Sequence, residues 1–136
     1  MVKPIMRDAF FLNQKSEEAT KVDLPVAQDL EDTLKANRER CVGMAANMIG
    51  YRKRIIIVAT GLADMVMINP VITKKSEPYD TEEGCLSLPG VRKTTRFQKI
   101  TVRYLDKKFA EHTQSFSGYI AQIIQHECDH LEGILI

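Results

Sequence analysis

The sequence lacks tryptophan, has few other aromatic residues, and shows no excess of either charge. Aromatic residues make up 7% of the chain, and 19 Lys and Arg residues balance 18 Asp and Glu residues, for a formal net charge of +1. Proteins that bind nucleic acid usually carry a clear basic excess, so we expect no direct nucleic-acid site. Basic residues do gather at Arg52–Arg54 and again between Arg92 and Arg96. We interpret both groups as solvated strand edges.

Long apolar runs and paired cysteines are also missing. The first eight residues contain no apolar run typical of a secretory leader, and no segment has the length needed to span a bilayer. The three cysteines, Cys41, Cys85 and Cys128, are an odd number. Free thiols or metal ligation are therefore favoured over a disulfide framework. Together these absences predict a cytoplasmic protein with no membrane association.

The 136 residues fit one compact domain, 1–136, and show no internal repeat, linker or low-complexity tract. Apolar spacing predicts an amphipathic helix over 26–37, with Asp23 ahead of Pro25 as its N-terminal cap. Gly118 opens a second predicted helix, over 119–131, and Gly133 follows its end. Residues rich in β-branched or alternating side chains predict strands over 54–58, 65–72, 100–104 and 113–116.

Two details refine the predicted strands. Pro70 indicates that the 65–72 strand lies at an edge or bends, and 84–90 is expected to be a short extended segment between turn residues. The last two strands are expected to form a hairpin across a loop containing Asp106, Lys107 and Lys108. The predicted fold is α+β, with antiparallel strands packed around a central helix that carries a His-Glu-x-x-His motif.

That motif runs from His126 to His130 and provides the sharpest functional signal in the chain. Residues four apart share one face of a helix, so the two imidazoles can converge on a divalent transition metal. Glu127 lies about 100° around the helix from His126 and can handle the proton of a bound water without ligating the metal. Two surface histidines on an amphipathic helix are the alternative, but isoleucines at 120, 123 and 124 give the preceding turn apolar surroundings.

A catalytic metal site needs a third protein ligand and one open position. Only six residues follow His130, and Glu132 among them points elsewhere on the helix, so the ligand is expected upstream. His112 has the sequence context of a loop histidine. Cys128 is rotated about 200° from His126, which favours a core position. Cys41 remains a candidate, and Cys85, in the turn-bounded segment, is the best one.

Three segments in order complete the pattern: Cys41 to Gly50, Glu82 to Pro89, and Gln125 to Gly133. With these motifs the chain resembles the peptide deformylases, and the similarity covers nearly its whole length. The resemblance implies removal of the N-formyl group from the initiator methionine of new proteins. It implies one divalent metal per chain, Fe²⁺ in cells with Zn²⁺ or Ni²⁺ as substitutes, on Cys85, His126 and His130.

The resemblance also implies roles for other residues. Glu127 would be the general acid and base, and the backbone N–H of Leu86 one donor to the oxyanion. The substrate-binding residues would be Val42, Gly43, Met48, Glu83, Gly84, Tyr119 and Ile123, with His126 beside the methionine side chain. The implied partners are N-formylmethionyl nascent peptides. The chain ends at Ile136, soon after the motif, whereas many members continue into a segment that in some docks onto the ribosome, so such docking is doubtful for this chain.

The first segment departs from the family pattern at two positions. The family has glycine where this chain has Cys41, and glutamine where it has Met48. That glutamine resembles a side-chain donor to the oxyanion, and methionine has no donor. Rescue by the amide of Asn47 is not expected, because neighbouring residues face different ways. Two hypotheses follow: a deformylase whose turnover Met48 lowers, or a catalytically impaired relative that binds metal and formyl-peptides or a regulatory partner.

Overall fold

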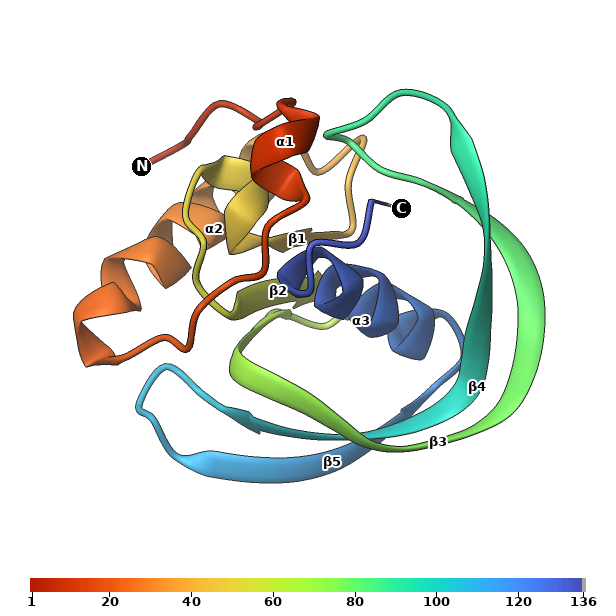
Figure 1. Cartoon of the computed structure of the whole chain (residues 1–136). Helices are drawn as coiled ribbons and strands as arrows, with labels where there is room; N and C mark the ends of the chain where they lie inside the picture. Colours follow the sequence, from red (N-terminus) through yellow and green to blue (C-terminus); the bar gives the residue numbers. More distant parts are fainter. Residues whose placement is uncertain (136) are drawn as a thin grey trace.

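The chain folds into a five-stranded antiparallel sheet with three helices, as the computed structural model shows for residues 1–135 (Figure 1). The helices are α1 (Ala9–Leu12), α2 (Leu24–Ala36) and α3 (Gly118–Leu131), and short 3-10 helices cover Lys21–Asp23 and Ala46–Ile49. The strands are β1 (Gly43–Ala45), β2 (Ile55–Ala59), β3 (Asp64–Gly84), β4 (Val91–Leu105) and β5 (Glu111–Ser117). The predicted α+β class is confirmed.

The sheet follows chain order, β1-β2-β3-β4-β5, with every neighbouring pair antiparallel. Its largest part is the β3–β4 hairpin, which stays in register up to Gly84 opposite Val91. Figure 1 shows these two strands curving around α3. The bend in β3 falls where Pro70 predicted one: the register shifts between Ile68 and Val71, and Asn69 adopts a positive φ of 51°.

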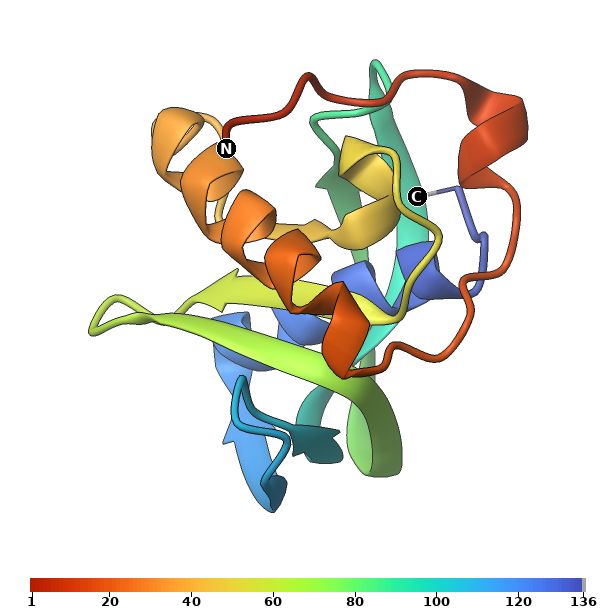
Figure 2. The ribbon, with the colours of Figure 1, turned by 90° about the vertical axis from the view of Figure 1, so that its left-hand side faces the viewer.

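Both long helices pack on the short strands at the start of the sheet. Four consecutive residues of β2, Ile55–Val58, are fully buried, which requires cover on both faces of the strand. α2 and α3 each contact β1 and β2 and supply that cover, and Figure 2 shows α2 lying across these strands. α3 also contacts β4 and β5. Within the described part of the chain, no helix has the length and apolar character to cross a membrane.

The N-cap of α2 is Asp23, as predicted, although its carboxylate accepts from the N–H of Thr20 and makes no hydrogen bond to α2. Two other local predictions were wrong. Residues 86–90 form bends rather than an extended segment. Arg96 is not at a solvated edge: it is only 4% exposed and forms buried ion pairs. A surface arginine remains hydrated, whereas the charge of a buried arginine must be neutralised by acidic partners. For Arg96 these partners are Glu83 and Asp129.

Candidate metal centre and substrate cavity

The residue that follows β3 and the C-terminal half of α3 bring three metal-binding side chains together. Cys85, His126 and His130 each offer a ligand atom, and these atoms all lie within 4.8 Å of one another. The Nε2 of His130 lies 3.2 Å from the Sγ of Cys85 and 3.2 Å from the Nε2 of His126. The two imidazoles share a face because they are one helical turn apart. The structure therefore assembles the three residues that the sequence singled out.

The donor set fits a divalent transition metal. A thiolate and two imidazoles around a tetrahedral ion, at 2.3 and 2.0–2.1 Å, should be separated from one another by about 3.3–3.6 Å. The separations of His130 Nε2 from Cys85 Sγ and from His126 Nε2, both 3.2 Å, are close to that geometry. Burial, together with the positive charges of His126 and Arg96, lowers the pKa of His130 to about 3. His130 is therefore neutral near pH 7, as a ligand must be.

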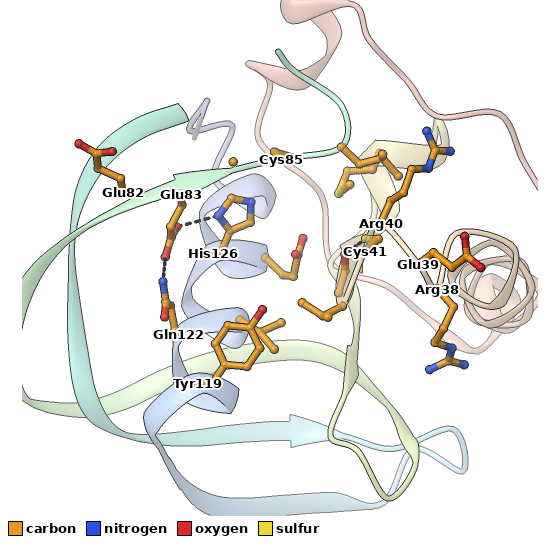
Figure 3. Close-up of a pocket in the computed structure, with 17 residues that line it drawn as sticks. Arg38, Glu39, Arg40, Cys41, Glu82, Glu83, Cys85, Tyr119, Gln122 and His126 are labelled. Carbon is orange, nitrogen blue, oxygen red and sulfur yellow. Dashed lines mark hydrogen bonds and ion pairs between the residues drawn. The ribbon is translucent and has the colours of Figure 1, made fainter. Parts of the chain in front are cut away.

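A chain of buried charges fixes the orientation of His126. Its Nδ1 lies 2.8 Å from the Oε1 of Glu83, which also receives the guanidinium of Arg96 at 2.7 Å. Arg96 reaches Asp129 in turn, at 2.6 Å. The amide of Gln122 donates to Glu83 at 2.9 Å, and Figure 3 shows this contact and that of Glu83 with His126. Burial raises the pKa of Glu83, but these hydrogen bonds outweigh it and bring the pKa to about 2. Glu83 is thus ionised, so the Nδ1 of His126 donates to it and Nε2 faces the other ligands.

Glu127 lies beside the ligands without belonging to them. Glu127 is 4% exposed as a residue, and its Oε1 is buried with no hydrogen-bond partner among residues 1–135. Burial raises the pKa of Glu127 to about 7. A carboxyl that gains and loses a proton near neutral pH, with one oxygen unengaged in a cavity, is suited to general acid–base catalysis.

One cavity of about 460 Å³ joins these groups to the predicted substrate residues. Its lining includes each residue predicted to bind substrate: Val42, Gly43, Met48, Glu83, Gly84, Tyr119 and Ile123. Gly43 is required by close packing, because a Cβ at that position would lie 2.6 Å from Ile123 Cγ2 and 3.1 Å from Glu127 Oε2. Gly43 thus keeps the backbone of β1 close to Glu127.

The three groups considered as oxyanion donors, at Leu86, Met48 and Asn47, differ in their hydrogen bonding. The N–H of Leu86, in the bend after Cys85, has no acceptor among the described residues and remains available. Met48 is 1% exposed, lines the cavity, and accepts from the N–H of Ala45 through Sδ at 3.4 Å. Asn47 is fully buried and donates to the backbone carbonyl of His130 at 2.9 Å. Its amide is therefore engaged elsewhere, as expected.

The remaining candidate ligands stay outside the cluster. The thiol of Cys41 lines the cavity but donates to the carbonyl of Gly43 at 2.7 Å, and burial raises its pKa to about 12. Burial raises the pKa of Cys128 to about 12 as well. His112 lies on β5 rather than in a loop and contacts Asp106 at 2.7 Å. Glu132 pairs with Arg54 at 3.0 Å.

The sequence reasoning missed the groups that support the ligands. Arg96 and Asp129 were not recognised, and Gln122 was not expected in the cavity. One signal was available: Asp129 lies inside the motif, three residues from His126, and a basic partner for it had to come from another element. That partner, Arg96, lies on β4 of the long β3–β4 hairpin. The polar sequence of the hairpin gave no signal for its full length.

Comparisons with known proteins agree with this geometry. The family profile described as "Polypeptide deformylase" matches residues 3–136. A peptide deformylase of Clostridium beijerinckii is 60% identical over 136 residues, which cover 100% of both chains, and one of Pelotomaculum thermopropionicum is 39% identical over 91% of this chain and 81% of its own.

Two solved structures show the same fold. A peptide deformylase of Acinetobacter baumannii, with Met-Ala-Ser bound, has a TM-score of 0.88 and 31% identity, covering 99% of this chain and 97% of its own. The peptide deformylase of Thermotoga maritima has a TM-score of 0.89 and 29% identity, covering 99% and 95%. The family predicted from the sequence is confirmed, and with it the enzyme class. This chain belongs to the polypeptide deformylase family.

Proposed function

We propose that this chain hydrolyses the N-formyl group of the initiator methionine of newly made proteins, with Glu127 as its general acid and base. The observation that carries the proposal is the unengaged Oε1 of Glu127 in the cavity that also holds Cys85 and His126. Cys85, His126 and His130 would hold one divalent metal, for which we propose Fe²⁺ in the cell and Zn²⁺ or Ni²⁺ as substitutes. The substrates are formylated nascent peptides, so we place the reaction in the cytoplasm.

Glu127, Leu86 and Glu83 each have a separate role in the proposed reaction. When bound, the metal supplies a water of lowered pKa and a Lewis acid for the formyl oxygen. Glu127 accepts the proton of the attacking water and then delivers it to the amine nitrogen that leaves. The N–H of Leu86 donates to the oxygen on which negative charge develops. Glu83 keeps His126 in the orientation that ligation requires, and we infer that α3 is the central helix that holds this arrangement.

The methionine side chain would occupy the apolar part of the cavity. Val42, Tyr119 and Ile123 line that part, and the A. baumannii relative is known with a peptide that begins with methionine. Gly43 and Gly84 would let the peptide backbone come close to the ligands. A formyl group carries only hydrogen on its carbonyl carbon, so a close-packed site admits it and excludes bulkier acyl groups.

Met48 supports a second candidate function, an impaired deformylase that binds formyl-peptides or a regulatory partner. Loss of one oxyanion donor typically lowers turnover by about 10²–10³-fold. The thioether of Met48 lines the cavity and offers no donor. The backbone N–H of Leu86 and the metal would still stabilise the oxyanion, which is why we favour hydrolysis.

The test is hydrolysis of formyl-Met-Ala by protein purified without oxygen and reloaded with Fe²⁺ or Ni²⁺. We expect turnover that falls by at least about 10²-fold in Glu127→Gln, which keeps the volume of the side chain but cannot accept the proton. The bound metal is measured in both proteins and should stay at one per chain. Full loading without turnover in the wild type would reject hydrolysis and favour the impaired relative.

A further inference from the structure

Two arginines lie around a second hollow that opens beside the catalytic cavity. Arg7, Arg40 and residues 84–86 and 88–90 line this hollow. Arg40, Gly84, Cys85 and Leu86 line the catalytic cavity as well. The two spaces therefore share one wall, so a peptide that reaches the ligands along this wall passes next to both guanidinium groups.

Neither arginine is neutralised by an acid within residues 1–135. Arg7 donates through Nη1 to the carbonyl of Leu86 at 3.0 Å, and Arg40 donates through Nη2 to the side-chain oxygen of Asn37 at 2.8 Å. The neighbouring Arg38 is different, because two of its nitrogens pair with Asp64 at 2.7 Å each. A guanidinium has five N–H donors, so Arg7 and Arg40 both keep donors free for an anion.

The nearby acids do not cancel this positive charge. Glu39 precedes Arg40 in the chain, but their side chains point in different directions in Figure 3 and form no ion pair. Asp8 follows Arg7, and its carboxylate is engaged by the N–H of Phe10 at 3.0 Å, where it caps α1. Apart from the metal-binding thiol of Cys85, residues 84–90 add no ionisable side chain to the hollow.

We infer that Arg7 and Arg40 form a carboxylate-binding subsite that favours formyl-methionyl peptides with an acidic residue shortly after the methionine. The inference rests on the proposed function, since it takes the peptide to run from the ligands along the shared wall. Arg7 is well placed for this role, because its bond to the Leu86 carbonyl ties it to the segment that would lie against the substrate. Both arginines are specificity-determining residues and take no part in the proton transfers.

The experiment compares C-terminally amidated peptides, so that the only carboxylate is in a side chain. Formyl-Met-Glu-Ala-amide and formyl-Met-Ala-Glu-amide are each paired with the matched Gln peptide, and kcat/KM is measured for each. We expect the better Glu peptide to exceed its Gln partner by about 3- to 10-fold at low salt, with the ratio shrinking as ionic strength rises. In Arg7→Gln/Arg40→Gln the ratio should fall to within about 2-fold. Lys99→Gln/Arg103→Gln, at two exposed positions on β4, changes the net charge equally and should keep the ratio.

A binding measurement keeps the subsite and the function separate. The unformylated products, Met-Glu-Ala-amide, Met-Ala-Glu-amide and their Gln partners, are titrated calorimetrically into metal-loaded protein. Tighter binding of a Glu peptide that depends on Arg7 and Arg40 would support the subsite even if no formyl-peptide were hydrolysed, and the proposed function alone would then fail. Efficient hydrolysis with equal binding and equal kcat/KM for Glu and Gln peptides would overturn the subsite and leave the function standing.

Discussion

Replacing Met48 with glutamine should raise deformylation, because the cavity provides a place for a side-chain donor. The Sδ of Met48 now accepts the N–H of Ala45 at 3.4 Å, and the side chain is 1% exposed and lines the cavity. Glutamine is similar in length, and its carbonyl oxygen is a stronger acceptor for the same N–H. With the oxygen held by Ala45, the amide nitrogen is left to donate into the cavity, where the oxyanion forms.

The size of the gain follows from what one such donor contributes. Removal of an oxyanion donor costs about 2.7–4 kcal/mol, which sets the upper limit for restoring one. Burying an amide that is not fully hydrogen-bonded in the free enzyme costs about 1–3 kcal/mol, and this cost falls on stability as well as on positioning. We therefore expect kcat/KM to rise by about 10- to 100-fold, or roughly 1.4–2.7 kcal/mol.

The assay is formyl-Met-Ala hydrolysis at matched metal content, with Met48→Leu as the control. Leucine conserves the apolar volume of methionine and has no donor, so this variant should stay within about 3-fold of the wild type. Its urea midpoint and that of Met48→Gln show whether both are folded. A folded, fully loaded Met48→Gln protein that is no faster than Met48→Leu would refute the reasoning, since the defect would then not be the missing donor.

Three further changes test the rest of the site. Cys85→Ser should lower bound metal well below one per chain after dialysis, whereas Cys128→Ser should stay near one by metal analysis. Arg96→Met removes the guanidinium that pairs with buried Glu83 and partly exposed Asp129, so urea unfolding should show a loss of about 3–5 kcal/mol, and metal affinity should fall about 10- to 100-fold. In metal-free protein the pKa of Glu127 is raised to about 7 from 4.5. The stability this carboxyl contributes is therefore present below pH 4.5 and is lost as pH rises through 7. Relative to Glu127→Gln, urea unfolding should show a loss of about 3 kcal/mol across that window, from 2.5 pKa units at 1.36 kcal/mol each.

The ligands and the last helix could be predicted from sequence because their signals are local. His126 and His130 are four residues apart on a segment that begins at Gly118, and the observed α3 begins there. The strand over 100–104 alternates buried and exposed side chains, and the structure keeps that alternation within β4. Each of these inferences needs only the helix or strand period, which the chain carries within a few residues.

The network around Glu83 could not be predicted, because it depends on a pairing between distant segments. Residues 73–82 are polar and mostly exposed on both faces, so their sequence shows no strand period, yet they pair with β4 through long-range register. That register brings Arg96 opposite Tyr79 and lets its guanidinium reach Glu83. From the sequence alone, a basic residue in a polar stretch is expected to be solvated, and only tertiary packing overrides that expectation.

The charges in this network explain why the ligand set is stable as a buried unit. Glu83, Glu127 and Asp129 surround the site, and among the described residues Arg96 is the only Lys or Arg side chain that pairs with any of them, namely with Glu83 and Asp129. Burial lowers the pKa of His126, but its hydrogen bonds to Cys85 and Glu83 outweigh this and raise the pKa to about 10, so a proton on the imidazole supplies positive charge. A divalent cation on Nε2 would supply more, while Nδ1 stays bonded to Glu83. Glu83 thus has two effects: it orients His126, and its negative charge favours binding of a cation, which compensates the charge of the buried carboxylates.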